Sequence, residues 1–441
     1  MAEIIPFKGI RFNTEKTGDL SQVTAPPYDV ISRKERDMFY DTHPANVIRL
    51  ILGKDKDTDS EKDNRHTRAF EYFTKWRQEN ILATDETPSI YFSAVDFDLD
   101  GRVVTRFGMT AMAKIEPFDK GIILPHEKTF SKVKSERLEL MKACRANFSP
   151  IFSVYRDKDH SLASFREEVM KKTPDSDFKD GFGHRHRMWR VTDPSAHETI
   201  RASMKDNAIF IADGHHRYET ALNYRNFLAD TDPDFHDGSG ARYIMMYLCA
   251  MDDPGLIILP AHRLLSGIDP DLLHSLPERA KAHFDVEAVP FDSSDVAAGA
   301  AGFESMLKAR EDRNAIGVSI RGAREFYLLT LKPGEMERAF GDSIPPSLIR
   351  LDVTVLTRLV MMRLLGFDKE TLDNEQMIRY SSRTRGAVEA VLNEKCDVAF
   401  ILNPTRMSQV REVAREGLIM PRKSTYFYPK VITGQVMRAL D

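Results

Sequence analysis

A short buried strand that leads directly into a helix constrains the fold of this chain more than any other segment. Residues 209–212 are all apolar, Asp213 and Gly214 form a turn, and helical spacing continues to about residue 228. Tyr243–Ala250 has the pattern of another buried strand. Buried strands that alternate with helices are typical of sheets covered by helices, so we expect an α/β (α+β) fold.

The same alternation continues along all 441 residues, which is enough chain for two or three domains. We expect an N-terminal α/β region at residues 1–105, a central domain at 106–262 that contains the strand–turn–helix segment, and a C-terminal α/β domain at 263–441. Other clear predicted elements are helices at 60–78, 136–146, 295–308 and 384–393 and strands at 89–97, 103–115, 315–320 and 325–331.

Composition excludes several classes of protein. The net charge of -4 gives no basic excess, so nucleic acid is not an expected partner. Every apolar stretch is shorter than the ~18 to 20 residues that cross a bilayer, and the start of the sequence has no signal-peptide pattern. The three cysteines, Cys144, Cys249 and Cys396, lie far apart, which fits a reducing compartment. We therefore expect a cytoplasmic protein without membrane contact, and the sequence leaves a homodimer open.

The junction between strand and helix at residues 213–217 has the chemistry of an anion site. The first backbone N–H groups of a helix have no intrahelical partner, and the positive end of the helix dipole lies beside them. Gly214 lets a ligand approach the backbone closely. His215, His216 and Arg217 add side-chain donors, and the planar guanidinium of Arg217 suits phosphate oxygens. These residues predict a phosphate-binding turn.

Two other interpretations of the turn stay open. Asp213 could be a simple helix cap, but a cap would not explain two histidines and an arginine in one turn, where cations repel one another without an anion. The two histidines could instead bind a metal ion. Adjacent helical residues point about 100° apart, however, so His215 and His216 rarely reach the same ion.

A second candidate group is the Pro-His-Glu sequence at residues 125–127. Glu127 follows a strand end made rigid by Pro125, where a carboxylate is well placed to take a proton from a substrate hydroxyl. Taken alone, Glu127 could equally be a solvated loop acid. Its pairing with the phosphate-binding turn favours a catalytic role.

These two motifs resemble those of the ParB/sulfiredoxin-like superfamily, and of its free serine kinases in particular. The resemblance implies this fold for the central domain, with Glu127 as the general base and Asp213 and His215 as further catalytic residues. It also implies a Mg²⁺ contact for Asp213. Other members of the superfamily use the equivalent turn to bind CTP or ATP. Four residues are implied to contact the nucleotide and its phosphates, namely His126, Gly214, His216 and Arg217.

Over its full length the chain resembles the bacterial family known as domain of unknown function 1015. The stretches that carry this likeness are residues 6–9 with 25–30, residues 145–151 and residues 420–430. Arg422 and Lys423 lie in the last of them, and they could add phosphate donors or belong to a rigid closing segment.

The spacing between the two motifs departs from the compact members of the superfamily. Asp213 lies 86 positions after Glu127, so this chain carries an insertion that could reshape the pocket. Within the insertion, His184 and His186 share one face of a predicted strand. An exposed polar strand would explain these two residues without any ligand.

We therefore predict a nucleotide-dependent phosphotransferase, a kinase that acts on a small hydroxyl substrate such as free serine or O-phosphoserine, including the direction of serine formation. ADP or ATP would be the co-substrate, and Mg²⁺ would bridge its phosphates. The sequence contains no G-x-x-x-x-G-K-[ST], which excludes an ordinary P-loop. A ParB-like nucleotide-binding switch without turnover and a phosphoserine phosphatase remain alternatives.

Overall fold

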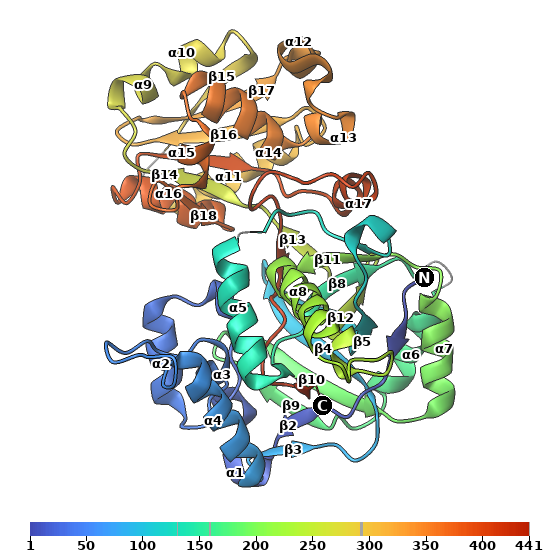
Figure 1. Ribbon diagram of the computed structural model, residues 1–441. Coiled ribbons are helices and arrows are strands. Elements are labelled where there is room, and N and C mark those ends of the chain that lie inside the picture. The colour runs from blue at the N-terminus through green and yellow to red at the C-terminus, as the bar shows by residue number, and fades with distance from the viewer. Residues whose placement is uncertain (130, 158–159, 292–293, 441) are drawn as a thin grey trace. The chain divides into compact units, whose positions relative to one another are not determined.

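The chain forms two compact units in its computed structural model (Figure 1). The structure describes residues 1–129, 131–157, 160–291 and 294–440. Unit 1 comprises Met1–Ile257 together with Pro429–Asp441, and unit 2 comprises Ile258–Tyr428. Unit 2 is therefore inserted into the sequence of unit 1, to which the last residues of the chain belong.

The predicted boundary at residue 105 falls inside a hairpin. β4 (Ile90–Leu99) and β5 (Arg102–Lys114) pair in antiparallel fashion along their length. Residues 1–105 and 106–262 consequently share one sheet and one compact unit. The sequence pattern shows which segments are strands but not which strands pair, and strand pairing decides this grouping.

The C-terminal bounds of unit 1 also differ from the bounds of the predicted regions. Unit 1 ends at Ile257, close to the predicted boundary at residue 262, but residues 429–441 belong to it as well. Residues 429–441 of the predicted region 263–441 thus lie in unit 1. That the three predicted regions fold separately remains a prediction.

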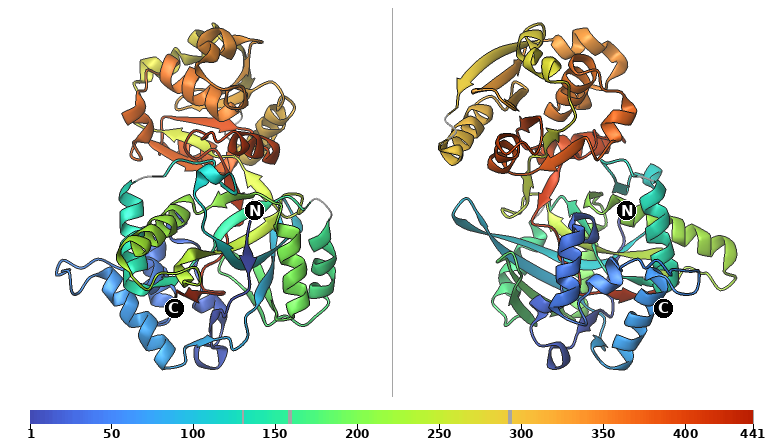
Figure 2. Two further views of the ribbon diagram at one scale, coloured as in Figure 1. Left: turned by 45° about the vertical axis from the view of Figure 1, so that its right-hand side comes forward. Right: turned by 90° about the vertical axis from the view of Figure 1, so that its left-hand side faces the viewer.

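Unit 1 is built on a mixed nine-stranded sheet (Figures 1 and 2). Its strands run in the order β6-β11-β8-β12-β5-β4-β10-β9, and β1 also pairs with β5. β6 and β11 are parallel, as are β8 and β12, whereas the other pairs are antiparallel. The strands besides β4 and β5 are β1 Ile4–Ile5, β6 Ile123–Leu124, β8 Ile151–Tyr155, β9 Ser176–Lys179, β10 Arg185–Val191, β11 Ile209–Asp213 and β12 Tyr243–Ala250.

Helices pack against this sheet through apolar side chains. α6 (Ser161–Met170), α7 (Pro194–Met204) and α8 (His215–Thr231) contribute buried residues to the same cluster as β8, β11 and β12. α8 begins directly after β11, as the pattern of residues 209–228 predicts. This arrangement confirms the α/β (α+β) class, while the ParB/sulfiredoxin-like fold of the central domain stays a prediction.

The remaining elements of unit 1 surround a second apolar cluster. α5 occupies most of the predicted helix at 136–146 but starts earlier in the sequence. These elements are α1 Thr14–Thr17, α2 Arg33–Thr42, α3 Ile48–Ile51, α4 Arg65–Gln78, α5 Ser131–Cys144 and the two small sheets β2 Ile10–Phe12 with β3 Leu82–Thr84 and β7 Ala146–Asn147 with β21 Arg438–Ala439.

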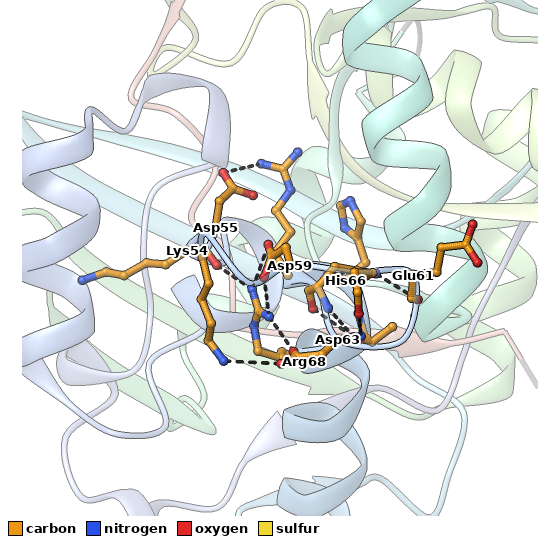
Figure 3. A network of polar contacts seen from close by, with 12 residues as sticks. Lys54, Asp55, Asp59, Glu61, Asp63, His66 and Arg68 are labelled. Carbon is orange, nitrogen blue, oxygen red and sulfur yellow. Dashed lines mark hydrogen bonds and ion pairs between the residues drawn. The ribbon is translucent and has the colours of Figure 1, made fainter.

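The start of α4 is fixed by polar contacts in the loop before it (Figure 3). The Arg68 guanidinium lies 2.7 Å from an Asp59 carboxylate oxygen and 2.5 Å from one of Asp63, and it donates to the Lys54 carbonyl oxygen at 2.9 Å. The Asn64 side chain accepts from the backbone N–H groups of the first helical turn. This cap is why the helix begins at Arg65 rather than at the predicted residue 60.

Unit 2 is an antiparallel six-stranded sheet with helices packed on both faces. Its strand order is β15-β17-β16-β19-β14-β18, and both predicted strands, at 315–320 and 325–331, are present. β15 is an edge strand that was not predicted, although apolar and charged residues alternate over residues 284–287. Among the residues that the structure describes, none of the helices is both long and apolar enough to cross a bilayer.

The bounds of the unit 2 elements complete the fold. β13 Ile257–Leu259 begins at the last residue of the first unit 1 segment. The other strands are β14 His262–Leu265, β15 Phe284–Pro290, β16 Ala315–Ile320, β17 Glu325–Leu331, β18 Ile378–Ser381, β19 Val398–Leu402 and β20 Tyr426–Tyr428. The helices are α9 Pro270–His274, α10 Leu276–Ala280, α11 Val296–Lys308, α12 Glu335–Phe340, α13 Pro346–Ile349, α14 Asp352–Val355, the π-helix Leu356–Leu364, α15 Lys369–Asp373, α16 Thr384–Leu392 and α17 Met407–Arg415.

Candidate functional site

Parallel strand pairing brings the two predicted motifs together. In the register of β6 and β11, Ile123 is opposite Ile209 and Leu124 is opposite Phe210. The carboxyl ends of parallel strands lie at the same edge of a sheet. The Pro-His-Glu segment that follows β6 and the Gly-His-His-Arg turn that follows β11 therefore emerge beside each other, although they are far apart in the sequence.

An irregularity in β11 precedes the turn. On the neighbouring strand β8, Ser153 is opposite Ile211 but Phe152 is already opposite Asp213, so Ala212 is an extra residue. A β-bulge of this kind increases the local twist and redirects the side chains that follow, and bulges are frequent next to active sites. The bulge thus sets the direction of Asp213 at the end of the strand.

Gly214 makes the turn between β11 and α8. Its φ of 95° lies in the left-handed region, and a Cβ atom here would lie 2.9 Å from Nε of Arg217. Only glycine fits this backbone conformation and this close contact without strain. Gly214 has no side chain to cap α8, so an anion bound at this end would take the place that a capping side chain has in other helices.

Asp213 lies between two cations from different parts of unit 1. Its Oδ2 atom lies 2.6 Å from Nη2 of Arg217, and its Oδ1 atom accepts from Nζ of Lys430. Arg217 also donates from Nη1 to the carbonyl oxygen of Pro150, while its buried Nε has no hydrogen-bond partner among the described residues. The side chains of Asp213, Arg217 and Lys430 are only 11–12% exposed. Two positive charges and one negative charge give the group a net charge of +1, beside the positive end of α8.

A buried arginine holds the segment that carries Lys430. Arg106 is only 2% exposed, and it donates to the carbonyl oxygen of Pro429, the residue before Lys430. Its guanidinium lies 4.6 Å from the ring centre of Phe152 and 5.3 Å from that of Tyr247. Cation–π contacts of this kind stabilise a buried guanidinium. Arg106 therefore fixes the backbone next to Lys430 from inside unit 1.

Glu127 and the two buried histidines form the other side of the site. The backbone N–H of His126 donates to Nε2 of His215 at 3.3 Å, and the two imidazole rings are nearly perpendicular. Because Nε2 of His215 accepts this bond, a neutral ring carries its hydrogen on Nδ1. Nδ1 lies 3.9 Å from Oε2 of Glu127. The predicted base is about a quarter exposed, whereas both histidines are buried.

The buried histidines are neutral, which corrects one argument from the sequence. Burial lowers the pKa of His126 to about 4, and burial and the nearby His126 lower the pKa of His215 well below its ordinary value. Neither ring carries a charge near pH 7, so the repulsion expected between cations in this turn does not arise from His215. Arg217 and Lys430 supply the positive charge of the turn instead.

The other predicted site residues lie in different surroundings. His216 occupies the second position of α8 and is partly exposed. The predicted accessory residues Arg422 and Lys423 belong to unit 2, where Arg422 pairs with Glu375 and Lys423 is exposed. The sequence did not single out Lys430, although it is the last residue of the 420–430 stretch.

Comparison with known families gives one match that covers most of the chain. The model of the family described as "Protein of unknown function (DUF1015)" matches residues 4–354. The stretches at 6–9, 25–30 and 145–151 lie within the matched residues, and the stretch at 420–430 lies beyond them. A search of curated proteins gave no match.

Solved structures give distant likenesses. A mutant free serine kinase in complex with ADP is 12% identical over 72% of this chain and 87% of its own, with a TM-score of 0.35. SbnI with a C-terminal truncation, from Staphylococcus aureus, is 12% identical over 74% and 86% of the two chains, also with a TM-score of 0.35. A conserved hypothetical protein from Pyrococcus furiosus is 13% identical over 72% and 90%, with a TM-score of 0.33. At such scores these likenesses do not place individual residues of this chain.

Proposed function

The chain belongs to the DUF1015 family of proteins of unknown function, and we propose that it is a nucleotide-dependent phosphotransferase that acts on a small hydroxyl compound. The observation that supports this best is the convergence of a carboxylate with a positively charged helix end. Glu127 follows β6, the turn at 213–217 follows β11, and these strands are parallel neighbours.

The turn is suited to phosphate for three reasons. The amide end of α8 begins at a glycine without a side-chain cap. Arg217 and Lys430 bring two cations to the carboxylate of Asp213 at this end of α8. The Nε atom of Arg217 is a buried donor without a hydrogen-bond partner among the described residues, and a buried donor that is left unsatisfied is costly. If the guanidinium turned from Asp213 towards the ligand, a phosphate oxygen would satisfy this donor.

Glu127 and His215 supply the acid–base chemistry of the proposed reaction. Glu127 takes the proton of the attacking hydroxyl, or returns it in the reverse direction. The neutral His215, whose Nδ1 lies 3.9 Å from Oε2 of Glu127, would donate a hydrogen bond to that carboxylate if the two groups moved closer, and it adds no second formal charge. Arg217 and Lys430 stabilise the negative charge on the transferred phosphoryl oxygens.

Mg²⁺ is compatible with the groups present. This ion typically uses one or two carboxylates together with phosphate oxygens, and Asp213 is the carboxylate of the turn. Both of its oxygens contact cations in this structure, so Asp213 would bind Mg²⁺ after Arg217 or Lys430 turned towards the phosphate. When bound, the ion would supply further neutralisation of the phosphate charge. Magnesium and the direction of transfer are parts of the proposal.

The acceptor and the nucleotide are proposed in the same terms. Free serine and O-phosphoserine are the proposed substrate pair, and ADP or ATP is the proposed co-substrate. The experiment is to incubate the full chain and Mg²⁺ with ATP and serine, and separately with ADP and serine, and to follow phosphorus by ³¹P NMR. A phosphoserine signal that grows while the nucleotide loses its terminal phosphate is the expected result, and phosphoserine with AMP or ADP tests the reverse reaction.

Two other outcomes would contradict the phosphotransferase. Release of inorganic phosphate from phosphoserine, at the same rate with and without nucleotide, would indicate a phosphatase. Saturable nucleotide binding without any change in the phosphorus spectrum over many hours, in both directions, would indicate a binding switch.

A further inference from the structure

The turn between β9 and β10 lies at the end of the unit 1 sheet (Figure 1). Three side chains that can ligate a metal ion converge at this turn. Nδ1 of His184 lies 3.3 Å from Oδ2 of Asp180, and Nε2 of His186 lies 2.9 Å from the same oxygen. The potential ligand atoms of Asp180, His184 and His186 all lie within 4.8 Å of one another. Two imidazoles thus point at a single carboxylate oxygen.

These separations fit a small metal ion. In a tetrahedral zinc site the ligand atoms lie about 2.0–2.1 Å from the ion, so neighbouring ligand atoms are roughly 3.3 Å apart. The two distances from Oδ2 of Asp180 match that separation within a few tenths of an ångström. The ligand atoms of the two imidazoles lie within 4.8 Å of each other.

The local backbone presents the ligands in this direction. Oδ1 of Asp180 accepts from the backbone N–H groups of Phe182 and His184, at 2.9 and 3.0 Å, which leaves Oδ2 for the imidazoles. His184 directly precedes β10 and His186 is its second residue, so in extended backbone the two side chains lie on the same face. Second contacts that orient a ligating carboxylate are characteristic of metal sites.

Burial and aromatic contacts also favour a built site over a solvated polar strand. The side chains of Asp180, His184 and His186 are 12%, 14% and 6% exposed. The ring of Phe178 stacks on His186 with centroids 5.3 Å apart, and that of Phe182 lies 6.2 Å from His184. Apolar rings around a site limit the access of water and hold the imidazoles in place.

We propose that Asp180, His184 and His186 bind a divalent first-row transition metal ion, with zinc as the ion that fits this ligand set best. Two imidazoles and a carboxylate are borderline ligands that suit Zn²⁺, and a water molecule completes the tetrahedron. The ion ties the β9–β10 turn together at the edge of the sheet. This site is separate from the phosphate-binding turn, and its test does not depend on the proposed enzymatic activity.

The test is direct zinc binding by the full chain after removal of metal with EDTA and dialysis. Calorimetric titration with ZnCl₂ against a competing chelator is expected to show one tight site per chain. His184→Ala/His186→Ala removes two ligands and abolishes that site. His274→Ala, which changes an exposed histidine of unit 2, leaves it unchanged.

Asp180→Asn is the variant that keeps the turn. The amide oxygen can still accept from the backbone of Phe182 and His184, while the negative charge is lost. Its zinc affinity is expected to fall at least tenfold with an unchanged circular dichroism spectrum. Absence of a stoichiometric zinc site in the unaltered chain, or the same zinc affinity in Asp180→Asn, would overturn the proposal even if the double variant failed to fold.

Discussion

Arg217 is the residue on which the phosphate interpretation depends most. Its guanidinium contacts Asp213 and the Pro150 carbonyl oxygen, and its Nε is a buried donor without a hydrogen-bond partner among the described residues. If the guanidinium turned towards the ligand, a phosphate oxygen would satisfy this donor. Lys430 contacts the same carboxylate from the opposite end of the sequence. The sequence motif identified Arg217, but it could not identify Lys430, because the contact between residues 213 and 430 exists only in the folded chain.

Replacing Arg217 with alanine should weaken ADP binding by about 1.5 to 3 kcal/mol, the range for a hydrogen bond to a charged group. This corresponds to a rise in Kd of roughly 10- to 150-fold, measured by calorimetry. Arg225→Ala, on the same helix but bonded to the Ile115 carbonyl oxygen, is the control and should leave the Kd unchanged. Equal affinities in all three proteins would show that the turn does not bind phosphate.

Glu127→Gln should separate turnover from binding. The amide keeps the size of the side chain but cannot take a proton, so kcat should fall by roughly 10²- to 10⁴-fold while ADP affinity changes only a few-fold. The measurement is the ³¹P assay together with ADP calorimetry. A variant with a near-normal kcat would remove Glu127 from its role as the base.

At the scale of elements, the site depends on the parallel pairing of β6 with β11. Most strands and helices that flank the site could be predicted from apolar periodicity, and β12 has the predicted bounds Tyr243–Ala250. The pairing order could not be predicted, because periodicity assigns a side chain to a face but does not choose the neighbouring strand. The bulge at Ala212 was also unpredicted, since it is a property of the register between β11 and β8.

The turn itself gives a prediction for Gly214→Ala. An alanine at φ 95° is strained by about 1–2 kcal/mol, and its Cβ would displace the Arg217 guanidinium, which lies 2.9 Å away. ADP affinity should therefore fall at least tenfold while the circular dichroism spectrum stays unchanged.

Gly302→Ala is the matched control for this substitution. Gly302 lies within α11, where an added Cβ meets no atom within 4 Å. Alanine there should raise the free energy of unfolding by roughly 0.5 to 1 kcal/mol and leave ADP affinity unchanged. Normal ADP binding by Gly214→Ala would show that the close contact at the turn has no part in ligand binding.

At the scale of the whole molecule, each unit contains a fully buried neutral histidine. In unit 2, His262 accepts from the Leu402 backbone N–H at 3.1 Å, and burial lowers its pKa to about 3. The pKa of an unfolded histidine is about 6.5. Below that pH the unfolded chain binds a proton that the folded chain does not, so this contribution to stability is complete above pH 6.5 and is lost as the pH falls.

His262→Gln isolates this effect from opposing ones. As the pH falls from 7 to 5, His262 should lower the free energy of unfolding by about 2 kcal/mol. Burial raises the pKa of Asp352 to about 7, so Asp352 should raise the free energy of unfolding over the same range. The unfolding free energy of the variant, from urea titrations at both pH values, should therefore depend less on pH by about 2 kcal/mol. An identical pH dependence in both proteins would mean that His262 is not buried in neutral form.

The central claim, that the strand–helix turn after β11 binds nucleotide phosphate, is tested most directly by a crystal structure of the full chain with ADP. We predict that the terminal phosphate lies within hydrogen-bond distance of the backbone N–H groups of residues 215–217 and of the Arg217 guanidinium, with Glu127 facing the open side of that phosphate. ADP bound elsewhere, with Arg217 still held by Asp213 and Pro150, would contradict the claim.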